Sequence, residues 1–215
     1  MLQRNSLHNI LLVIGEYILI SVVGAVIIPL ACMALVPRLP ELTSLTFANN
    51  VTRTLHGVFV IAYVLLVYRR RSWGSVWLWG TNDSRKTLPM GIIVPVGFLI
   101  RLLFDGGLNK LNMLFLPMQS DMFTSVVTVP LAEELLFRGF LLRRLSEYLP
   151  KRWPAILLST VIFGLRHDNF LQAFVSGLLL CLLYAPQNDK SALSLGTGKL
   201  WVSIVTHTLV NIKTQ

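Results

Sequence analysis

Three apolar stretches in the C-terminal half of the chain carry ionisable or amide side chains. These residues are Glu133, Glu134, Arg138, His167, His207 and Asn211. A charge at bilayer depth costs several kcal/mol, and ionisable residues inside membrane segments usually line an interior cavity and carry function. We therefore interpret the six residues as parts of one candidate catalytic site.

The first stretch combines two adjacent carboxylates with an arginine. Glu134 and Arg138 are four residues apart, so on a helix they lie on one face and can pair. Glu133 is rotated by about 100° from its neighbour and can face a different element. The arginine would keep one carboxylate ionised, whereas burial would favour the protonated form of the other. This combination suits a general base in a dry site, and a purely structural ion pair is the alternative.

The other two stretches supply hydrogen-bond donors. His207 and Asn211 are one helical turn apart on one face, a spacing that suits the stabilisation of an oxyanion. Their alternative role is to join neighbouring helices by hydrogen bonds. His167 ends its apolar run, where an interfacial histidine is the alternative to a functional one. We interpret His8 and His56 as interfacial residues outside the site.

A metal site is a second possibility for the same residues. Glu133, His167 and His207 are the candidate ligands, because neutral imidazoles and a carboxylate suit zinc. The chain contains no His-Glu-x-x-His pair, so the spacing requires no metal or other cofactor. A serine nucleophile is poorly supported, because no Gly-x-Ser-x-Gly sequence is present.

The composition places the chain in a lipid bilayer. Hydrophobic residues make up 54% of the 215 residues and charged residues only 13%, with a mean hydropathy of +0.66. A soluble domain usually carries about 25% charged residues. The net charge of +9 does not indicate nucleic-acid binding, because the basic residues cluster in short loops between apolar runs, as membrane topology requires.

Seven apolar segments predict an all-α fold, a polytopic transmembrane helical bundle, because lipid cannot satisfy an open backbone. The segments cover approximately residues 10–36, 51–68, 88–104, 122–142, 154–166, 170–186 and 200–212. The first is interrupted by Pro29, and the short fifth and sixth segments give a range of six to eight spans. We expect the small residues Gly91, Gly97, Gly164, Ser176 and Gly177 to allow close contact between helices.

The distribution of lysine and arginine predicts the topology. With a cytoplasmic N-terminus, most basic residues of the loops fall on the cytoplasmic side. The first segment lacks a small-residue cleavage site, so we expect an uncleaved membrane helix. Residues 1–115 carry no motif and are the expected N-terminal group of helices, whereas residues 116–215 are the expected catalytic core.

In order along the chain, Glu-Glu-x-x-x-Arg, Phe-x-x-x-His and His-x-x-x-Asn resemble the motifs of the CPBP family. This family comprises the CAAX-protease and bacteriocin-processing (Abi) intramembrane proteases. The resemblance covers about residues 120–212, and the first motif lies in the sequence AEELLFRG at residues 132–139. Each motif alone is weak, but three intact motifs in the family's order are specific.

The resemblance implies a role for each motif. Glu133, with His167, would activate a water for attack on a peptide carbonyl. Glu134 and Arg138 would hold the geometry of that pair, and the histidine and asparagine of the third motif would stabilise the oxyanion. The family is often labelled metalloprotease, although a metal-free glutamate mechanism has been argued for its prenyl-protein member, so both mechanisms stay open.

The resemblance implies an intramembrane endopeptidase that acts on a membrane-associated peptide or protein. A compact chain of this kind resembles bacterial members, which implies a bacterial cell membrane and a role in bacteriocin self-immunity or peptide processing. The alternative is a non-catalytic membrane adaptor that binds a partner such as a sensor kinase or a bacteriocin receptor. A proton-relaying transporter is a weaker alternative, because the chain has no internal repeat. Intact motifs favour catalysis, although a fold alone does not prove function, and the oligomeric state stays open.

Overall fold

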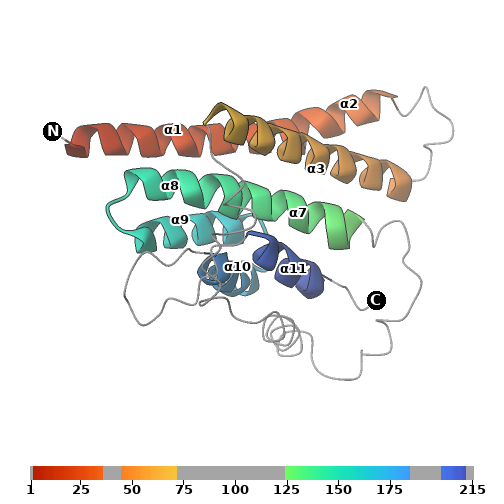
Figure 1. Ribbon diagram of the computed structural model, residues 1–215. Helices are drawn as coiled ribbons and strands as arrows, with labels where there is room; N and C mark the ends of the chain where they lie inside the picture. The colour runs from red at the N-terminus through yellow and green to blue at the C-terminus, as the bar shows by residue number, and fades with distance from the viewer. Residues whose placement is uncertain (1, 36–44, 72–123, 185–199, 212–215) are drawn as a thin grey trace, which may run out of the picture.

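A computed structural model of the chain describes residues 2–35, 45–71, 124–184 and 200–211 (Figure 1). These four ranges contain helices joined by short turns and no strand, which confirms the all-α prediction for them. Within them, two helices are long and apolar enough to cross a membrane, Leu7–Ala34 and Asn49–Arg70. The count of seven spans is not confirmed, and the predicted segment 88–104 lies outside the described residues.

The chain begins with one long helix that contains a widened turn. Helix α1 (Leu2–Val22), the π-helical turn η1 (Val23–Ile27) and α2 (Ile28–Leu35) follow one another without a loop. Pro29 has no N–H group, and its ring crowds the carbonyl four residues earlier. The N–H of Ile28 instead reaches back five residues to the carbonyl of Val23. The interruption expected at Pro29 is therefore a widened turn and not a break.

A second continuous helix forms the centre of the fold. It consists of η6 (Thr124–Thr128), α7 (Val129–Glu134), η7 (Leu135–Leu142) and α8 (Arg143–Tyr148). Here too a π-helical turn precedes a proline, Pro130. The helix stops at Tyr148 because Leu149 is extended and precedes Pro150, and a proline disfavours the helical conformation of the residue before it.

The helix continues beyond residue 142, where the predicted apolar segment ends. Arg144 lies within α8 and is buried, with its Nη2 3.5 Å from Glu16 Oε2 of α1 and its Nη1 3.8 Å from Glu147 Oε2. Two carboxylates therefore compensate this arginine. A charged sequence continues the helix here, although it ends the apolar run.

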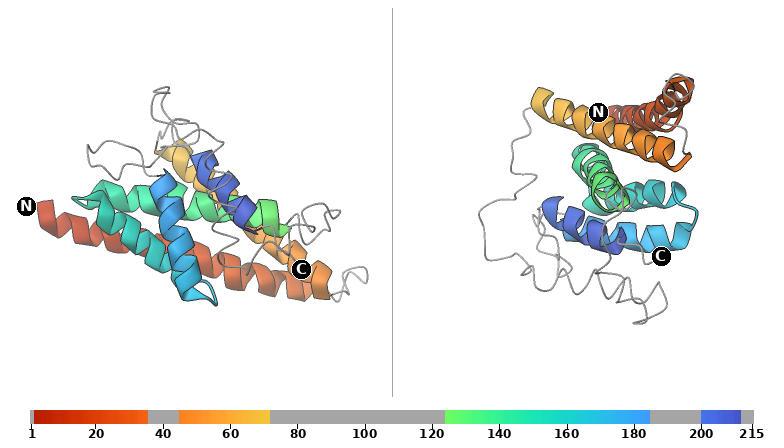
Figure 2. Two further views of the ribbon diagram at one scale, coloured as in Figure 1. Left: turned by 90° about the horizontal axis from the view of Figure 1, so that it is seen from below. Right: turned by 90° about the vertical axis from the view of Figure 1, so that its right-hand side faces the viewer.

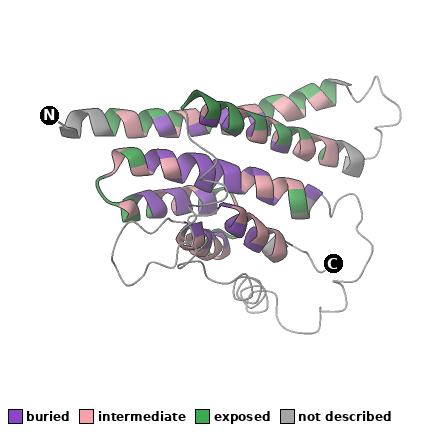
Figure 3. Ribbon diagram, in the orientation of Figure 1, coloured by how far each residue is buried: buried purple, intermediate pink, exposed green. Residues whose placement is uncertain are grey.

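The central helix lies between two layers of helices (Figures 1 and 2). On one side it contacts α1 and α3 (Leu45–Arg70), and on the other α9 (Arg152–Leu165), α10 (Phe170–Tyr184) and α11 (Leu200–Asn211). Every residue of η7 is buried, whereas the outer helices expose much of their surface (Figure 3). The last three helices begin and end within two residues of the predicted segments.

Helices α9 and α10 form a tight hairpin. Asn169 precedes α10 and accepts a hydrogen bond from the N–H of Gln172, which satisfies one free donor of the first turn. A Cβ atom on Gly164 would lie 2.9 Å from the ring of Phe170, and one on Gly177 would lie 2.9 Å from the ring of Phe163. The close helix contact expected at Gly164 and Gly177 is confirmed, whereas Gly91 and Gly97 lie outside the described residues.

Candidate active site

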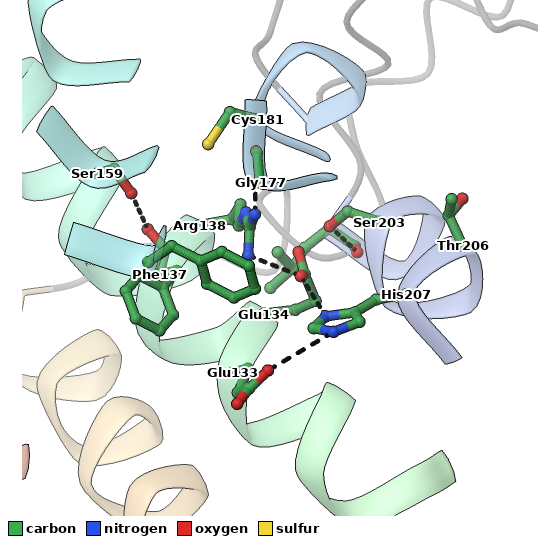
Figure 4. Close-up of polar contacts among 12 residues, drawn as sticks. Glu133, Glu134, Phe137, Arg138, Ser159, Gly177, Cys181, Ser203, Thr206 and His207 are labelled. Atoms are coloured by element: carbon green, nitrogen blue, oxygen red, sulfur yellow. Dashed lines mark hydrogen bonds and ion pairs between the residues drawn. The ribbon is translucent and has the colours of Figure 1, made fainter. Parts of the chain in front are cut away.

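The predicted ion pair is present at the centre of the molecule. Arg138 Nη1 donates a hydrogen bond of 2.8 Å to Glu134 Oε1, and both side chains are fully buried (Figure 4). Their spacing of four residues places both groups on one face of the central helix, as the sequence indicated. Neither charge would be tolerated here alone, because an uncompensated buried ion is strongly destabilising.

Arg138 is also held by two other elements. Its Nη2 donates a hydrogen bond of 3.0 Å to the carbonyl of Gly177 on α10. Its guanidinium carbon lies 4.6 Å from the centre of the Phe163 ring on α9, within the range of a cation–π interaction. The arginine therefore joins α9 and α10 to the central helix, and it fixes the position of the Glu134 carboxylate.

His207 bridges the two adjacent glutamates. Its Nδ1 lies 2.8 Å from Glu134 Oε1, and its Nε2 lies 3.5 Å from Glu133 Oε2 (Figure 4). A carboxylate accepts hydrogen bonds, so Nδ1 carries the proton in the first contact. Glu134 thereby sets the orientation of the ring and leaves Nε2 towards Glu133. The histidine and Glu134 are 73 residues apart, and no local spacing could have predicted this pairing.

His167 lies at the end of α9 and is half-buried. Its Nδ1 is 2.8 Å from the carbonyl oxygen of Phe163, and the two rings are 4.5 Å apart between centres. Because a carbonyl only accepts, Nδ1 carries the proton and Nε2 has the lone pair in the neutral ring. Within the described part of the chain, no hydrogen bond or ion pair joins His167 to Glu133.

Asn211 closes α11, one turn beyond His207. This places the two positions on one face of the helix, as the spacing predicted. The side chain of Asn211 lies outside the described part of the structure.

Glu133 opens onto a cavity of about 160 Å³ between α3, α7 and the end of α9. Its side chain is 18% exposed, in contrast to the fully buried Glu134. The other polar residues that line the cavity are Arg53, His56 and Arg166. The wall is completed by small and apolar residues, namely Gly57, Val60, Val129, Ala132 and Leu136.

His56, which the sequence placed outside the candidate site, lies beside Glu133 in the structure. It lines the same cavity as Glu133, and its ring lies against Gly24 of η1, where a Cβ atom would overlap it. Arg53 and His56 are three residues apart, so they share a face of α3. Two ionisable residues on one face at the start of an apolar segment were the available signal.

The candidate metal ligands do not gather into a metal site. Among the residues that the structure describes, no group of three His, Cys, Asp or Glu side chains could hold a metal ion. Nδ1 of His207 points to Glu134, and Nδ1 of His167 points to the carbonyl of Phe163. Of these two histidine rings, Glu133 contacts that of His207. The donor set in this arrangement does not fit zinc.

The two carboxylates of the site lie in different environments. Glu134 is buried in an ion pair with Arg138, whereas Glu133 reaches the cavity and lies beside Nε2 of His207. Pairs of titratable groups in unlike environments are how proteins separate a holding role from a proton-transfer role. The arrangement suits proton transfer to or from a small molecule such as water in the cavity.

Comparison with protein families matches residues 116–212 to the Rce1-like family, described as type II CAAX prenyl endopeptidase Rce1-like. Comparison with curated proteins and with solved structures gives no match. The match includes all three motifs and confirms the resemblance drawn from them. Together with the apolar helices, it identifies an integral membrane protein. Over residues 116–212, the chain is therefore similar to the Rce1-like family of CAAX prenyl endopeptidases, in agreement with the resemblance of its three motifs.

Proposed function

We propose that the protein is an intramembrane endopeptidase that hydrolyses a peptide bond of a membrane-associated protein or peptide, with Glu133 as the general base. The proposal rests on the unlike placement of the two adjacent glutamates. Glu134 is fully buried in its pair with Arg138, whereas Glu133 reaches the cavity and lies 3.5 Å from Nε2 of His207. Of these two glutamates, Glu133 is the one that can meet both water and a substrate.

The proposed reaction begins when Glu133 takes a proton from a water in the cavity. The water oxygen forms a bond to the carbonyl carbon of the peptide, and negative charge develops on the carbonyl oxygen. His207 Nε2, when it carries a proton, donates to that oxygen, and Asn211 is the proposed second donor. The C–N bond then breaks, the proton passes from Glu133 to the leaving amine, and the carboxylate is restored.

We assign the remaining motif residues to positioning and to proton transfer. Glu134 and Arg138 hold the ring of His207 in place, as their 2.8 Å contacts support. His167 has its Nε2 lone pair available, and it assists Glu133 with the proton of the attacking water. Catalytic hydrogen bonds often form only in the substrate complex, so the absence of a direct contact between His167 and Glu133 is compatible with this role.

We propose further that no resident metal is needed, because the donors do not gather into a metal site. Activity in purified protein should then survive a strong chelator. Loss of activity on chelation, with recovery on adding zinc, would refute this part of the proposal.

The proposed setting is a bacterial cell membrane with the N-terminus in the cytoplasm. There the protein would process a peptide or contribute to bacteriocin self-immunity. A non-catalytic adaptor that binds a membrane partner is the alternative, and the experiment below separates the two.

The test compares Glu133→Gln with Glu147→Gln, each in the full chain. Both changes remove one carboxylate from the central helix, but Glu147 lies in α8, where it pairs with Arg71 at 3.7 Å and Arg144 at 3.8 Å. We expect the Glu133 variant to lose about 10²–10⁴-fold in hydrolysis rate, whereas the Glu147 variant keeps near-normal activity. The readout is the peptide products of membranes with each variant, by mass spectrometry, together with the membrane level and thermal stability of the protein.

An adaptor would give a different pattern. Wild type and the Glu133 variant would then yield the same peptides and support the same phenotype, for example the same bacteriocin sensitivity. That result, at normal protein level and stability, would overturn the proposed hydrolysis.

A further inference from the structure

The cavity beside Glu133 carries an excess of basic side chains. Arg53 and His56 approach it from α3, and Arg166 approaches it from the end of α9. Glu133 is the only carboxylate among the described residues that line it. A cavity with two arginines and one carboxylate at the edge of an apolar bundle favours an anionic ligand.

The basic residues are placed by packing. The ring of His56 lies against Gly24. A side chain at position 24 would overlap this ring. The guanidinium carbon of Arg166 lies 5.9 Å from the centre of the ring of Phe137, a residue of the central helix. Arg166 is exposed, so it can exchange water for a ligand without first leaving a buried position.

The rest of the cavity wall is apolar. Gly57, Val60, Ala132 and Leu136 are all buried there, next to the basic residues. The volume of about 160 Å³ is close to that of a cavity of about 150 Å³ that holds benzene. The cavity therefore has room for a group about the size of one amino-acid side chain. An anionic group with an apolar attachment fits this combination of walls.

We propose that Arg53, His56 and Arg166 form a subsite that binds a carboxylate of the peptide substrate close to the scissile bond, while the apolar wall holds the side chain beside it. Arginine suits this task because its planar guanidinium matches a carboxylate with two parallel hydrogen bonds. The inference rests on the function proposed above and adds a specificity to it. A free C-terminal carboxylate and the side chain of Asp or Glu share the required chemistry.

The test uses the full chain in phosphatidylcholine nanodiscs with three matched mixtures of internally quenched peptides. The first mixture has a free C-terminal acid, the second a C-terminal amide, and the third an amide with one internal glutamate. The variants are Arg166→Gln and Arg166→Lys. Lys151→Gln is the control, because it removes a positive charge from an exposed residue just before the other end of α9.

We expect wild type to prefer at least one carboxylate mixture to the plain amide. Arg166→Gln should raise KM for that mixture about tenfold, as expected for the loss of one charge-assisted contact, with little change in kcat. Arg166→Lys should recover part of the loss, and Lys151→Gln should behave as wild type. Preference for the first mixture identifies the C-terminal carboxylate, and preference for the third identifies an acidic side chain.

Failure of the subsite differs from failure of the proposed function. If wild type cleaves all mixtures equally and Arg166→Gln changes nothing, the protease stands and the subsite is overturned.

If nothing is cleaved, the proposed function fails in this system, and fluorescence anisotropy of the same peptides decides the subsite. Acid-selective binding that depends on Arg166 supports it, and equal binding of acid and amide overturns it. Loss of the preference in phosphatidylglycerol nanodiscs would assign the basic residues to a lipid phosphate and also overturn it.

Discussion

Two apolar stretches that are in contact in this protein, the N-terminal helix and η7, differ sharply in burial. The segment Leu7–Ala34 contains one charged residue, Glu16, and only 22% of its most apolar window is buried. The stretch η7 is entirely buried although it contains Arg138. Apolar side chains such as Leu19 and Leu30 are exposed, whereas both members of the ion pair are fully buried. The burial pattern of a soluble protein is thus partly inverted.

The difference shows what each helix contributes. Lipid tails are as apolar as leucine, so outward leucines of α1 and α2 keep the protein in the membrane without driving the helices together. The central helix is the one that other helices must pack against, because its charges need partners from α10 and α11. Hydropathy marks both helices as apolar segments, but it does not show which of them is buried among other helices.

The sharpest way to break this contrast is Arg138→Met. The substitution keeps the volume roughly similar but leaves Glu134 buried without its cation, and we expect a loss of about 3–5 kcal/mol in the free energy of unfolding. Unfolding in mixed micelles with increasing SDS measures it. Lys151→Met, at an exposed residue, is the control and should be near neutral. The double variant Glu134→Gln with Arg138→Met should recover part of the loss, and a single variant as stable as wild type would contradict the interpretation.

A pair of leucines tests the contrast without charges. Leu136 is 1% exposed on the central helix, and Leu19 is 64% exposed on α1. We expect Leu136→Ala to cost about 2–5 kcal/mol through the cavity that it leaves. Leu19→Ala should stay within about 0.5 kcal/mol of wild type, because lipid fills the space. Equal effects in the same unfolding assay would mean that α1 is packed against protein and not against lipid.

Replacing one glycine in each region by alanine gives the smallest expected change in stability. The two replacements should change the stability in opposite directions. In α10, a Cβ on Gly177 would lie 2.9 Å from Phe163, next to the carbonyl that Arg138 contacts. In α1, a Cβ on Gly15 would meet nothing within 4 Å. We expect Gly177→Ala to destabilise by about 1–3 kcal/mol and Gly15→Ala to stabilise by about 0.5–1 kcal/mol. Thermal unfolding in one detergent compares them, and loss of stability in both variants would refute the distinction.

Local spacing predicted the parts of the site that lie on one helix. The pairing of Glu134 with Arg138 follows from the geometry of one turn, and the structure contains it at 2.8 Å. The helix that ends at Leu165 and the one that begins at Phe170 also follow from apolar length and from the polar turn between them. These features depend on residues that are neighbours in the chain.

Contacts between distant segments could not be predicted in this way. His207 meets Glu134 across 73 residues, and the position of Arg53 and His56 beside Glu133 depends on how α3 packs on α7. The catalytic assignments of the six motif residues, the division at residue 115 and the seven-span topology stay predictions. The widened turn at Pro29 was missed for another reason, because a helix can move one hydrogen bond to an earlier carbonyl and continue.

The π-helical stretch η7 affects the directions in which the side chains before and after it point from the central helix. Before it, Glu134 of α7 turns towards α11 and His207, and after it, Arg144 of α8 turns towards α1 and Glu16. A residue advances an α-helix by about 100°, and a π-helical turn, whose hydrogen bonds span five residues, changes that angle. Deleting one residue between them would change the angle about the helix axis between Glu134 and Arg144 unless a widened turn closed to compensate. The length of this stretch is therefore constrained by two contacts on opposite sides of the helix, in addition to the packing of its apolar side chains.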